Sequence, residues 1–202
     1  MSDSTFDGAE SNTDPIGWFQ RSHARALQGE RFDAARAALA TVDADGRPEV
    51  RFVLVKIVDA RGFVFFTNLE SAKARALAAT PQAALAFHWE SISEQVRVAG
   101  AVERVSDAEA DAYFAERPRG SQLAAWASRQ SVPIANRAAL VTSFEDVSRR
   151  FPGEEVPRPP YWSGFRVVPR TIEFWHSRDD RLHDRWLFTR AGGGWGMQRL
   201  QP

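Results

Sequence analysis

The residues best suited to chemistry are concentrated in the segment FWHSRDDRLHDRW, residues 174–186, which holds three arginines, three acids and two of the chain's four histidines. Such groups could bind a metal, contact nucleic acid, line a catalytic pocket, or pair with one another in a surface turn. His176 and His183 lack the spacing of a usual metal-ligand pair, so we expect no metal site. The segment alone does not decide between the remaining possibilities.

The second signal is compositional: of 26 basic residues only Lys56 and Lys73 are lysines. Base-composition bias could leave two lysines by chance. A requirement for a compact ammonium group beside a phosphate would explain the two lysines equally well. Tyrosine is also scarce, with Tyr113 and Tyr161 against 14 phenylalanines, which suggests a hydroxyl kept for its hydrogen bonds.

Three segments could use these residues to bind anions. RFVLVKI (51–57) is apolar enough to be a buried strand, yet it carries Arg51 and Lys56. Buried cations are costly without an anion, although each could also reach solvent at a strand end. Strict alternation puts the two on opposite faces, so one anion could meet both only near a bulge or a sheet edge.

The other two segments contain helix ends. TNLESAKAR (67–75) places Thr67, Ser71 and Lys73 at a helix N-terminus, which suits a phosphate but also fits ordinary capping. YFAERPRGSQ (113–122) puts Tyr113 and Arg117 at i, i+4, with Ser121 beyond Pro118. The alternative for this segment is a solvated helix end.

The overall composition limits the function classes. A length of 202 residues suits one domain, and a net charge of zero argues against nonspecific binding to nucleic acid or to anionic membranes. There is no apolar run of membrane-spanning length, no cysteine and no secretory signal pattern at the N-terminus. We therefore expect a cytoplasmic protein without nucleic-acid or membrane partners.

Periodicity and turn residues predict short strands with a few helices between them. Residues 1–13 are expected to be a disordered tail, and residues 14–202 a single domain. Strands are expected within 37–68, 83–90, 94–105, 165–175, 185–190 and 195–200, and helices from Asp14, from Ser71, and over 106–116, 121–130 and 135–151. This order indicates an α+β antiparallel barrel or sheet and not a parallel doubly wound fold.

Taken in order, several motifs over residues 36–202 resemble the pyridoxamine 5'-phosphate oxidase family. These motifs are RFVLVK, FFTNLESAK, RPRGSQLAAWASRQS, WSGFRV, IEFW, RLHDR and the terminal RLQP. The resemblance implies an α+β split β-barrel and a homodimer with FMN bound at the subunit interface. It also implies oxidation of pyridoxamine or pyridoxine 5'-phosphate to pyridoxal 5'-phosphate, with O2 as acceptor and hydrogen peroxide released.

The resemblance also implies roles for individual residues. The cofactor-binding set is Arg51, Phe52, Val53, Leu54, Val55, Lys56, Phe66, Thr67, Lys73, Gln95, Gln130, Ser131, Trp175 and Arg185. Within it, Lys73 would hold the FMN phosphate, Gln130 and Ser131 would come from the partner subunit, and a second group would surround the flavin ring: Gln95, Trp175 and Arg185. The substrate phosphate would meet Lys56, Tyr113, Arg117 and Ser121, while Arg181 and His183 would orient the substrate ring as the catalytic pair.

The chain departs from the family pattern at Ala72, where an arginine is common, and in residues 1–13, which lack the usual arginine and tyrosine of a substrate lid. Two other functions remain open. One is a related split-barrel flavin oxidase acting on another ring substrate, as in phenazine biosynthesis. The other is a non-catalytic protein that binds FMN or pyridoxal phosphate.

Overall fold

The computed structural model describes residues 14–153 and 155–202, so the disordered tail predicted for residues 1–13 lies outside the described part. In chain order the elements are α1 (Pro15–Ala26), β1 (Arg36–Val42), β2 (Pro48–Asp59), β3 (Gly62–Asn68), α2 (Ala72–Ala79), β4 (Gln82–Trp89), η1 (Glu90–Ile92), β5 (Glu94–Arg104), α3 (Asp107–Glu116), α4 (Arg119–Ala127), α5 (Arg137–Arg150), β6 (Trp162–His176), η2 (Asp179–Arg181), β7 (Asp184–Ala191) and β8 (Gly194–Leu200).

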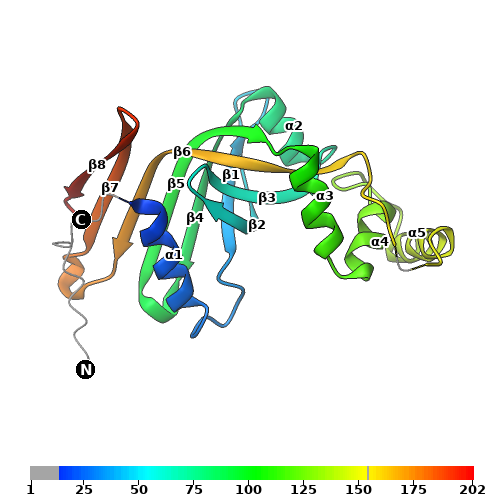
Figure 1. Cartoon of the computed structure of the whole chain (residues 1–202), viewed down its shortest axis with the longest axis horizontal. Coiled ribbons are helices and arrows are strands. Elements are labelled where there is room, and N and C mark those ends of the chain that lie inside the picture. Colours follow the sequence, from blue (N-terminus) through cyan, green and yellow to red (C-terminus); the bar gives the residue numbers. More distant parts are fainter. Residues whose placement is uncertain (1–13, 154) are drawn as a thin grey trace.

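The strands form one antiparallel sheet that closes on itself (Figure 1). Its order is β3-β2-β1-β4-β5-β6, and a further pairing between β3 and β6 joins the two ends into a six-stranded barrel. Strands β7 and β8 continue the sheet beyond β6 and lie outside the barrel. The prediction of an α+β split β-barrel with surrounding helices is confirmed.

The barrel interior follows from alternation along the strands, since every second side chain points inward. Leu39, Phe65 and Val98 are among the fully buried residues of the main core. Helix α1 covers one end of this core, where Phe19 packs edge-on against Phe63 and Phe87 at 4.9 and 4.8 Å between ring centroids. Burying an aromatic side chain of this size contributes about 1.5–3 kcal/mol, so α1 is held mainly by apolar contact.

Polar contacts set where α1 begins and how it is aligned. The side chain of Asp14 accepts a hydrogen bond from Ile16 N at 3.1 Å, and Pro15 occupies the first helical position, so the helix begins where the sequence predicted. Near the other end of the helix, Arg25 forms a 2.8 Å ion pair with Glu94, which is buried at the start of β5.

The remaining helices lie on the outside of the barrel. Helix α3 covers β3 and β6 through a small core of Val64, Val105 and Ala110. Helices α4 and α5 pack against each other farther from the barrel (Figure 1). Within the described residues, no helix is long and apolar enough to cross a membrane.

One helix ends earlier than expected. The sequence predicted a helix over residues 121–130, but α4 ends at Ala127 because Ser128 adopts an extended backbone (φ −105°, ψ 121°). Gln130 and Ser131 therefore belong to a loop, and Ser131 has a positive φ of 70°. This loop folds back to contact β3 and the start of α2.

Two register shifts bend the barrel wall. One lies between Val55 and Ile57 of β2, so Lys56 stands at a bulge. The other lies between Ala99 and Gly100 of β5, opposite β6. A Cβ atom on Gly100 would approach the carbonyl oxygen of Val168 to 1.9 Å, so only glycine fits there.

We expect Gly100→Ala to destabilise the barrel by about 1–3 kcal/mol, because the backbone of β6 must move to admit the methyl group. Urea unfolding followed by circular dichroism measures the change. Gly120→Ala is the control: its Cβ meets nothing within 4 Å, and alanine in helix α4 should stabilise slightly. Equal stability of Gly100→Ala and the wild type would contradict the close approach.

Candidate active site

The side chain of Lys73, in the first turn of α2, is surrounded by neutral oxygen atoms. Its Nζ lies 3.1 Å from Thr67 Oγ1, 3.3 Å from Ser71 Oγ and 2.9 Å from Gln130 Oε1. Ser71 also caps the helix by accepting from Ala74 N. The grouping of Thr67, Ser71 and Lys73 predicted from the sequence is therefore present.

No carboxylate is among these contacts, and a second cation lies nearby. Burial and the positive charge of Arg51 lower the pKa of Lys73 to about 8. Arg51 itself donates to Thr41 Oγ1 at 2.6 Å and pairs with Glu49 at 2.6 Å. Lys73, held by hydroxyl and amide oxygens at the start of α2 and close to a second cation, is suited to bind an anion such as phosphate.

Gln130 and Ser131 complete this site from the same chain. Thr67 Oγ1 donates to Gln130 Oε1 at 3.1 Å, and Ala72 N donates to Ser131 Oγ at 3.1 Å. The expectation that these two residues come from a partner subunit is corrected by these contacts. The early end of α4 is the physical reason, because it lets the following loop reach α2.

A second cationic group forms around Arg117, at the C-terminal end of α3. Tyr113 stacks on Phe66 with ring centroids 4.0 Å apart, and the Arg117 guanidinium lies 4.8 Å from the centre of the Trp162 ring. Burial lowers the pKa of Arg117, and its Nη1 is buried without a hydrogen-bond partner among the described residues. Ser121 lies in the first turn of the next helix, α4, where its N–H donates to the carbonyl oxygen of Pro118 at 2.8 Å. A buried, incompletely bonded guanidinium is suited to receive an anion.

The residues assigned to the flavin ring form a row across three strands. Gln95 of β5 is paired with Trp175 of β6, which is paired with Arg185 of β7, so the three lie side by side on one face of the sheet. Arg185 is held by Glu173 at 2.7 Å.

Arg181 and His183 follow directly in the turn between β6 and β7. Asp180 and Arg181 both have a positive φ, 55° and 61°, an uncommon conformation for residues other than glycine. The His183 ring lies 4.5 Å from the Trp175 ring, and its Nδ1 accepts a hydrogen bond from Arg178 N at 3.2 Å. A neutral His183 therefore carries its proton on Nε2, which is free to donate.

Ion pairs hold the rest of this turn. Arg178 Nε pairs with Asp184 Oδ2 at 2.7 Å, and Arg199 also pairs with Asp184. Together these contacts lower the pKa of the Asp184 carboxyl, with the hydrogen bond from Arg178 as the main cause. Within the described residues there is no cluster of three or more metal-ligating side chains.

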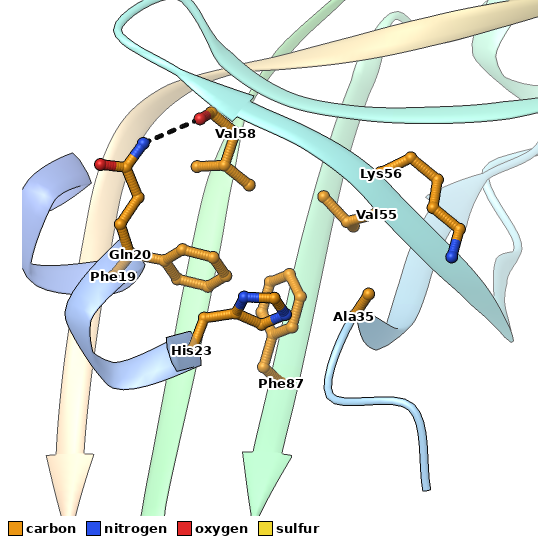
Figure 2. A pocket seen from close by; sticks show the side chains of 8 residues that line it. All are labelled: Phe19, Gln20, His23, Ala35, Val55, Lys56, Val58 and Phe87. Carbon is orange, nitrogen blue, oxygen red and sulfur yellow. Dashed lines mark hydrogen bonds between the residues drawn. The ribbon is translucent and has the colours of Figure 1, made fainter. Parts of the chain in front are cut away.

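Lys56, also assigned to the substrate phosphate, pairs with an acid of its own chain. Its Nζ is 3.4 Å from Asp33 Oδ2, and it borders a cavity of about 200 Å³ beside α1 that is also lined by His23 (Figure 2). Asp33 was missed in the sequence because a lone acid in a loop carries no motif. Among the described residues, no hydrogen bond or ion pair joins Lys56 to Tyr113, Arg117 or Ser121, and the shared role of the four residues stays a prediction.

The Lys73 site and the row of Gln95, Trp175 and Arg185 lie near opposite ends of β6. Thr67, which contacts Lys73, is paired with Ser163 near the start of β6, whereas Trp175 is near the end of the same strand. Twelve residues of extended strand span roughly 40 Å, farther than one FMN molecule can reach. Figure 1 shows β6 as a long, bent strand that runs along the barrel.

The structure is thus a split barrel with two partly buried cations, Lys73 and Arg117, whose surroundings suit negatively charged ligands. Comparison with known proteins makes the assignment narrower. The family described as pyridoxamine 5'-phosphate oxidase matches residues 26–151, and the pyridoxine 5'-phosphate oxidase C-terminal dimerisation region matches residues 162–202. The chain belongs to the pyridoxamine 5'-phosphate oxidase family.

Curated relatives agree over nearly the full length. The pyridoxine/pyridoxamine 5'-phosphate oxidase of Anaeromyxobacter dehalogenans is 58% identical over 94% of this chain and 96% of that protein. The protein of the same name from Brucella canis is 50% identical over the whole of both chains.

Among solved structures, PhzG from Burkholderia lata 383, in complex with tetrahydrophenazine-1-carboxylic acid, is similar with a TM-score of 0.89 and 30% identity, covering 96% of this chain and 95% of that one. A pyridoxamine 5'-phosphate oxidase-related, FMN binding protein from Nostoc punctiforme shares the fold with a TM-score of 0.75 at 20% identity, over 94% and 98% of the two chains.

The Lys73 site predicts a pH-dependent affinity for phosphate groups. An anion raises the pKa of Lys73 from about 8, so binding above that pH requires proton uptake and affinity falls as pH rises through about 8. The phosphate of FMN is already dianionic there, because its second pKa is near 6. We expect Lys73→Met to weaken FMN binding by about 10- to 100-fold and to remove this pH dependence.

Titration of the apoprotein with FMN, followed by quenching of flavin fluorescence between about pH 6.5 and 9.5, measures both effects. Arg75→Met on the same helix is the control, since Arg75 donates to the carbonyl oxygen of Glu70 and not into the Lys73 site. A Lys73→Met protein with wild-type affinity would show that the phosphate binds elsewhere.

Proposed function

We propose that the chain is an FMN-dependent oxidase that converts pyridoxamine or pyridoxine 5'-phosphate to pyridoxal 5'-phosphate, with O2 reduced to hydrogen peroxide. The observation that carries this proposal is the pair of cationic sites at Lys73 and Arg117. Each lacks a carboxylate partner among the contacts described above, and the reaction involves two phosphate-bearing ligands. Curated relatives of 50–58% identity bear the name of this activity.

The residues present fit FMN. Lys73, Thr67, Gln130 and Ser131 would hold its phosphate, with the strand 51–56 and Phe66 alongside. Gln95, Trp175 and Arg185 would surround the flavin ring, where the Arg185 guanidinium would stabilise negative charge. Bound FMN would supply the hydride acceptor and the reaction with O2, so the chain needs no base triad of its own. We propose that residues 14–202 act as one domain in this role.

The substrate would be held at both of its ends. Lys56, Tyr113, Arg117 and Ser121 would bind its phosphate, and Arg181 and His183 would orient its ring. The structure supplies a reason for the latter role: the free Nε2–H of His183 can donate to an acceptor on the pyridine ring. Arg181, in the same strained turn, would add a fixed positive charge.

We further propose that two copies of the chain build each site. The distance between the Lys73 site and the Trp175 row calls for a second subunit. The outer face of the barrel supports this: Val50 and Phe52 are each 71% exposed on β2. Val50 also borders a groove of small side chains that includes Ala38, Ala84 and Ala99. An apolar face of this kind is typical of a protein interface.

A second candidate function is oxidation of a phenazine-type ring substrate, which the similarity to PhzG favours. Such a substrate, free of phosphate, would leave Tyr113, Arg117 and Ser121 without a role. A non-catalytic binder of FMN or pyridoxal phosphate is the third possibility, and it would consume no oxygen.

The purified protein, supplied with FMN, should consume oxygen and form hydrogen peroxide with pyridoxamine or pyridoxine 5'-phosphate. An oxygen electrode with both substrates measures this. Arg181→Ala should lower kcat/KM by about 100-fold or more while FMN stays bound, because a charged contact to the substrate is lost. Tight FMN binding without oxygen uptake would favour the non-catalytic binder. Loss of FMN from Arg181→Ala would show that Arg181 belongs to the FMN site and not to the substrate site.

Placing a charge on the outer barrel face should disrupt the proposed dimer. We expect Val50→Asp to weaken self-association by about 100-fold or more, since a carboxylate would be buried in an apolar interface. FMN retention should fall with it. Leu27→Asp is the control, because Leu27 is also exposed but lies at the end of α1, away from this face. Analytical ultracentrifugation decides; a Val50→Asp protein that remains dimeric would contradict this interface.

A further inference from the structure

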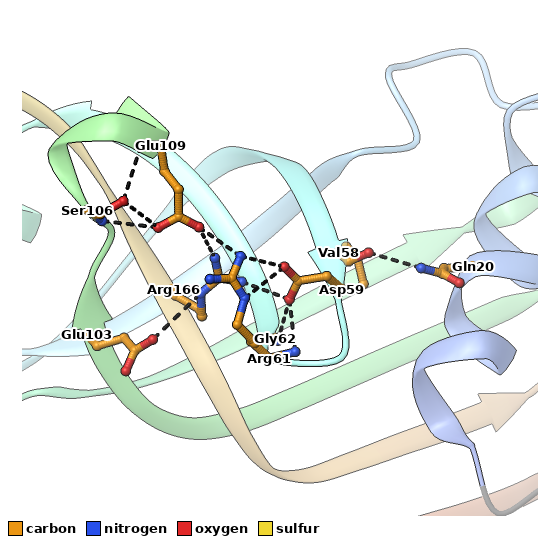
Figure 3. Close-up of polar contacts among 9 residues, drawn as sticks. All are labelled: Gln20, Val58, Asp59, Arg61, Gly62, Glu103, Ser106, Glu109 and Arg166. Carbon is orange, nitrogen blue, oxygen red and sulfur yellow. Dashed lines mark hydrogen bonds and ion pairs between the residues drawn. The ribbon is translucent and has the colours of Figure 1, made fainter. Parts of the chain in front are cut away.

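The most deeply buried charged group in the described part of the chain lies outside the sites discussed so far. Arg166, in the middle of β6, is 1% exposed. Its guanidinium pairs with Asp59 Oδ1 at 2.8 Å and Glu109 Oε1 at 2.8 Å, and Glu103 lies at 3.6 Å (Figure 3). These three acids come from the end of β2, from α3 and from β5.

Arg61 closes the cluster from the solvent side. Its Nη2 lies 2.9 Å from Asp59 Oδ2 and 2.8 Å from Glu109 Oε1. Burial alone would raise the pKa of Asp59, but hydrogen bonds from Arg61 and the charges of Arg166 and Arg61 hold it below its usual range. Hydrogen bonds from Ser106 and Arg61 lower the pKa of Glu109. Both acids are therefore charged at neutral pH, and the cluster is fully paired.

Glu109 connects this cluster to the beginning of α3. Its carboxylate accepts from Ser106 N at 3.1 Å, while Ser106 Oγ accepts from Glu109 N at 3.2 Å, which forms a capping box. One carboxylate thus caps the helix and fixes its first turn to β6 and to the turn between β2 and β3.

Helix α3 also carries the residues of the Arg117 site. Glu109 and Tyr113 are spaced at i, i+4 on the helix, and Arg117 is the residue that ends it. Tyr113 stacks on Phe66 and Arg117 on Trp162, and both rings belong to the barrel wall. A rotation or shift of α3 would move the phenol and the guanidinium together.

We propose that the Arg166 cluster is a positioning device: through Glu109 it fixes the register of α3, so that Tyr113 and Arg117 are preorganised for the substrate phosphate. Buried ion pairs contribute little net stability, because desolvation offsets their attraction. Their directional hydrogen bonds are better suited to fix one arrangement among several. The proposal rests on the proposed function, since it assigns the Arg117 site to that substrate.

Glu109→Gln tests it, because glutamine can still cap Ser106 but loses the charge that meets Arg166 and Arg61. We expect KM for pyridoxamine 5'-phosphate to rise about tenfold, with kcat and FMN affinity within about twofold of the wild type. Arg61→Gln, at an exposed position, should raise KM about threefold in the same pattern and serves if Glu109→Gln does not fold. Glu103→Gln is the matched control: it removes a charge beside Arg166 but lies on β5, so KM should not change.

The proposal is overturned if Glu109→Gln and Arg61→Gln leave KM unchanged. It is also overturned if kcat and FMN affinity fall as KM rises, which would indicate general loosening of the fold. It is also overturned if Glu103→Gln raises KM as much as Glu109→Gln. If the wild type oxidises no B6 phosphate, the proposed function fails, but the positioning role can still be tested by calorimetry with inorganic phosphate and the FMN-loaded proteins. A Kd for phosphate that is about tenfold higher in Glu109→Gln than in the wild type supports the positioning role, and an unchanged Kd refutes it.

Discussion

The pairing of β3 with β6 is the constraint on which the rest of the structure depends. It closes the barrel, and it requires β6 to run along the whole barrel while also pairing with β5 and β7. One end of β6 then lies beside Thr67 and the Lys73 site, and the other end carries Trp175 between Gln95 and Arg185. Residues suited to one cofactor are thereby held at opposite ends of one strand, and a second copy of the chain is the simplest way to unite them.

Charge pairing separates the parts of the molecule that support the fold from those that await a ligand. Arg166 is surrounded by carboxylates of its own chain and needs nothing more. Lys73 and Arg117 are also partly buried, but their neighbours are hydroxyls, amides and aromatic rings, so burial lowers the pKa of both. The cost of holding such cations in the free protein can be offset by an incoming phosphate dianion. A chain of zero net charge can in this way contain strongly cationic sites.

Local patterns in the sequence predicted the architecture well. Alternation and turn residues gave the strands, Asp14 and Ser106 marked helix starts, and the rarity of lysine pointed to Lys73 beside Thr67 and Ser71. Contacts between distant segments were not predictable in this way. The pairing of Lys56 with Asp33, and the return of Gln130 to Lys73 of its own chain, depend on loop paths that leave no periodic signal. The family resemblance suggested the site residues, but it placed Gln130 and Ser131 in the partner subunit, whereas they contact the Lys73 site of their own chain.

The central claim is that each site is shared between two chains, and complementation tests it most directly. Lys73→Ala and Arg181→Ala should each be nearly inactive as homodimers. When the two are co-expressed, half of the dimers are mixed, and each mixed dimer contains one site with both residues intact. The account predicts recovery of about a quarter of wild-type oxygen consumption. Activity that stays at the level of the two separate variants would show that Lys73 and Arg181 serve a site within one chain.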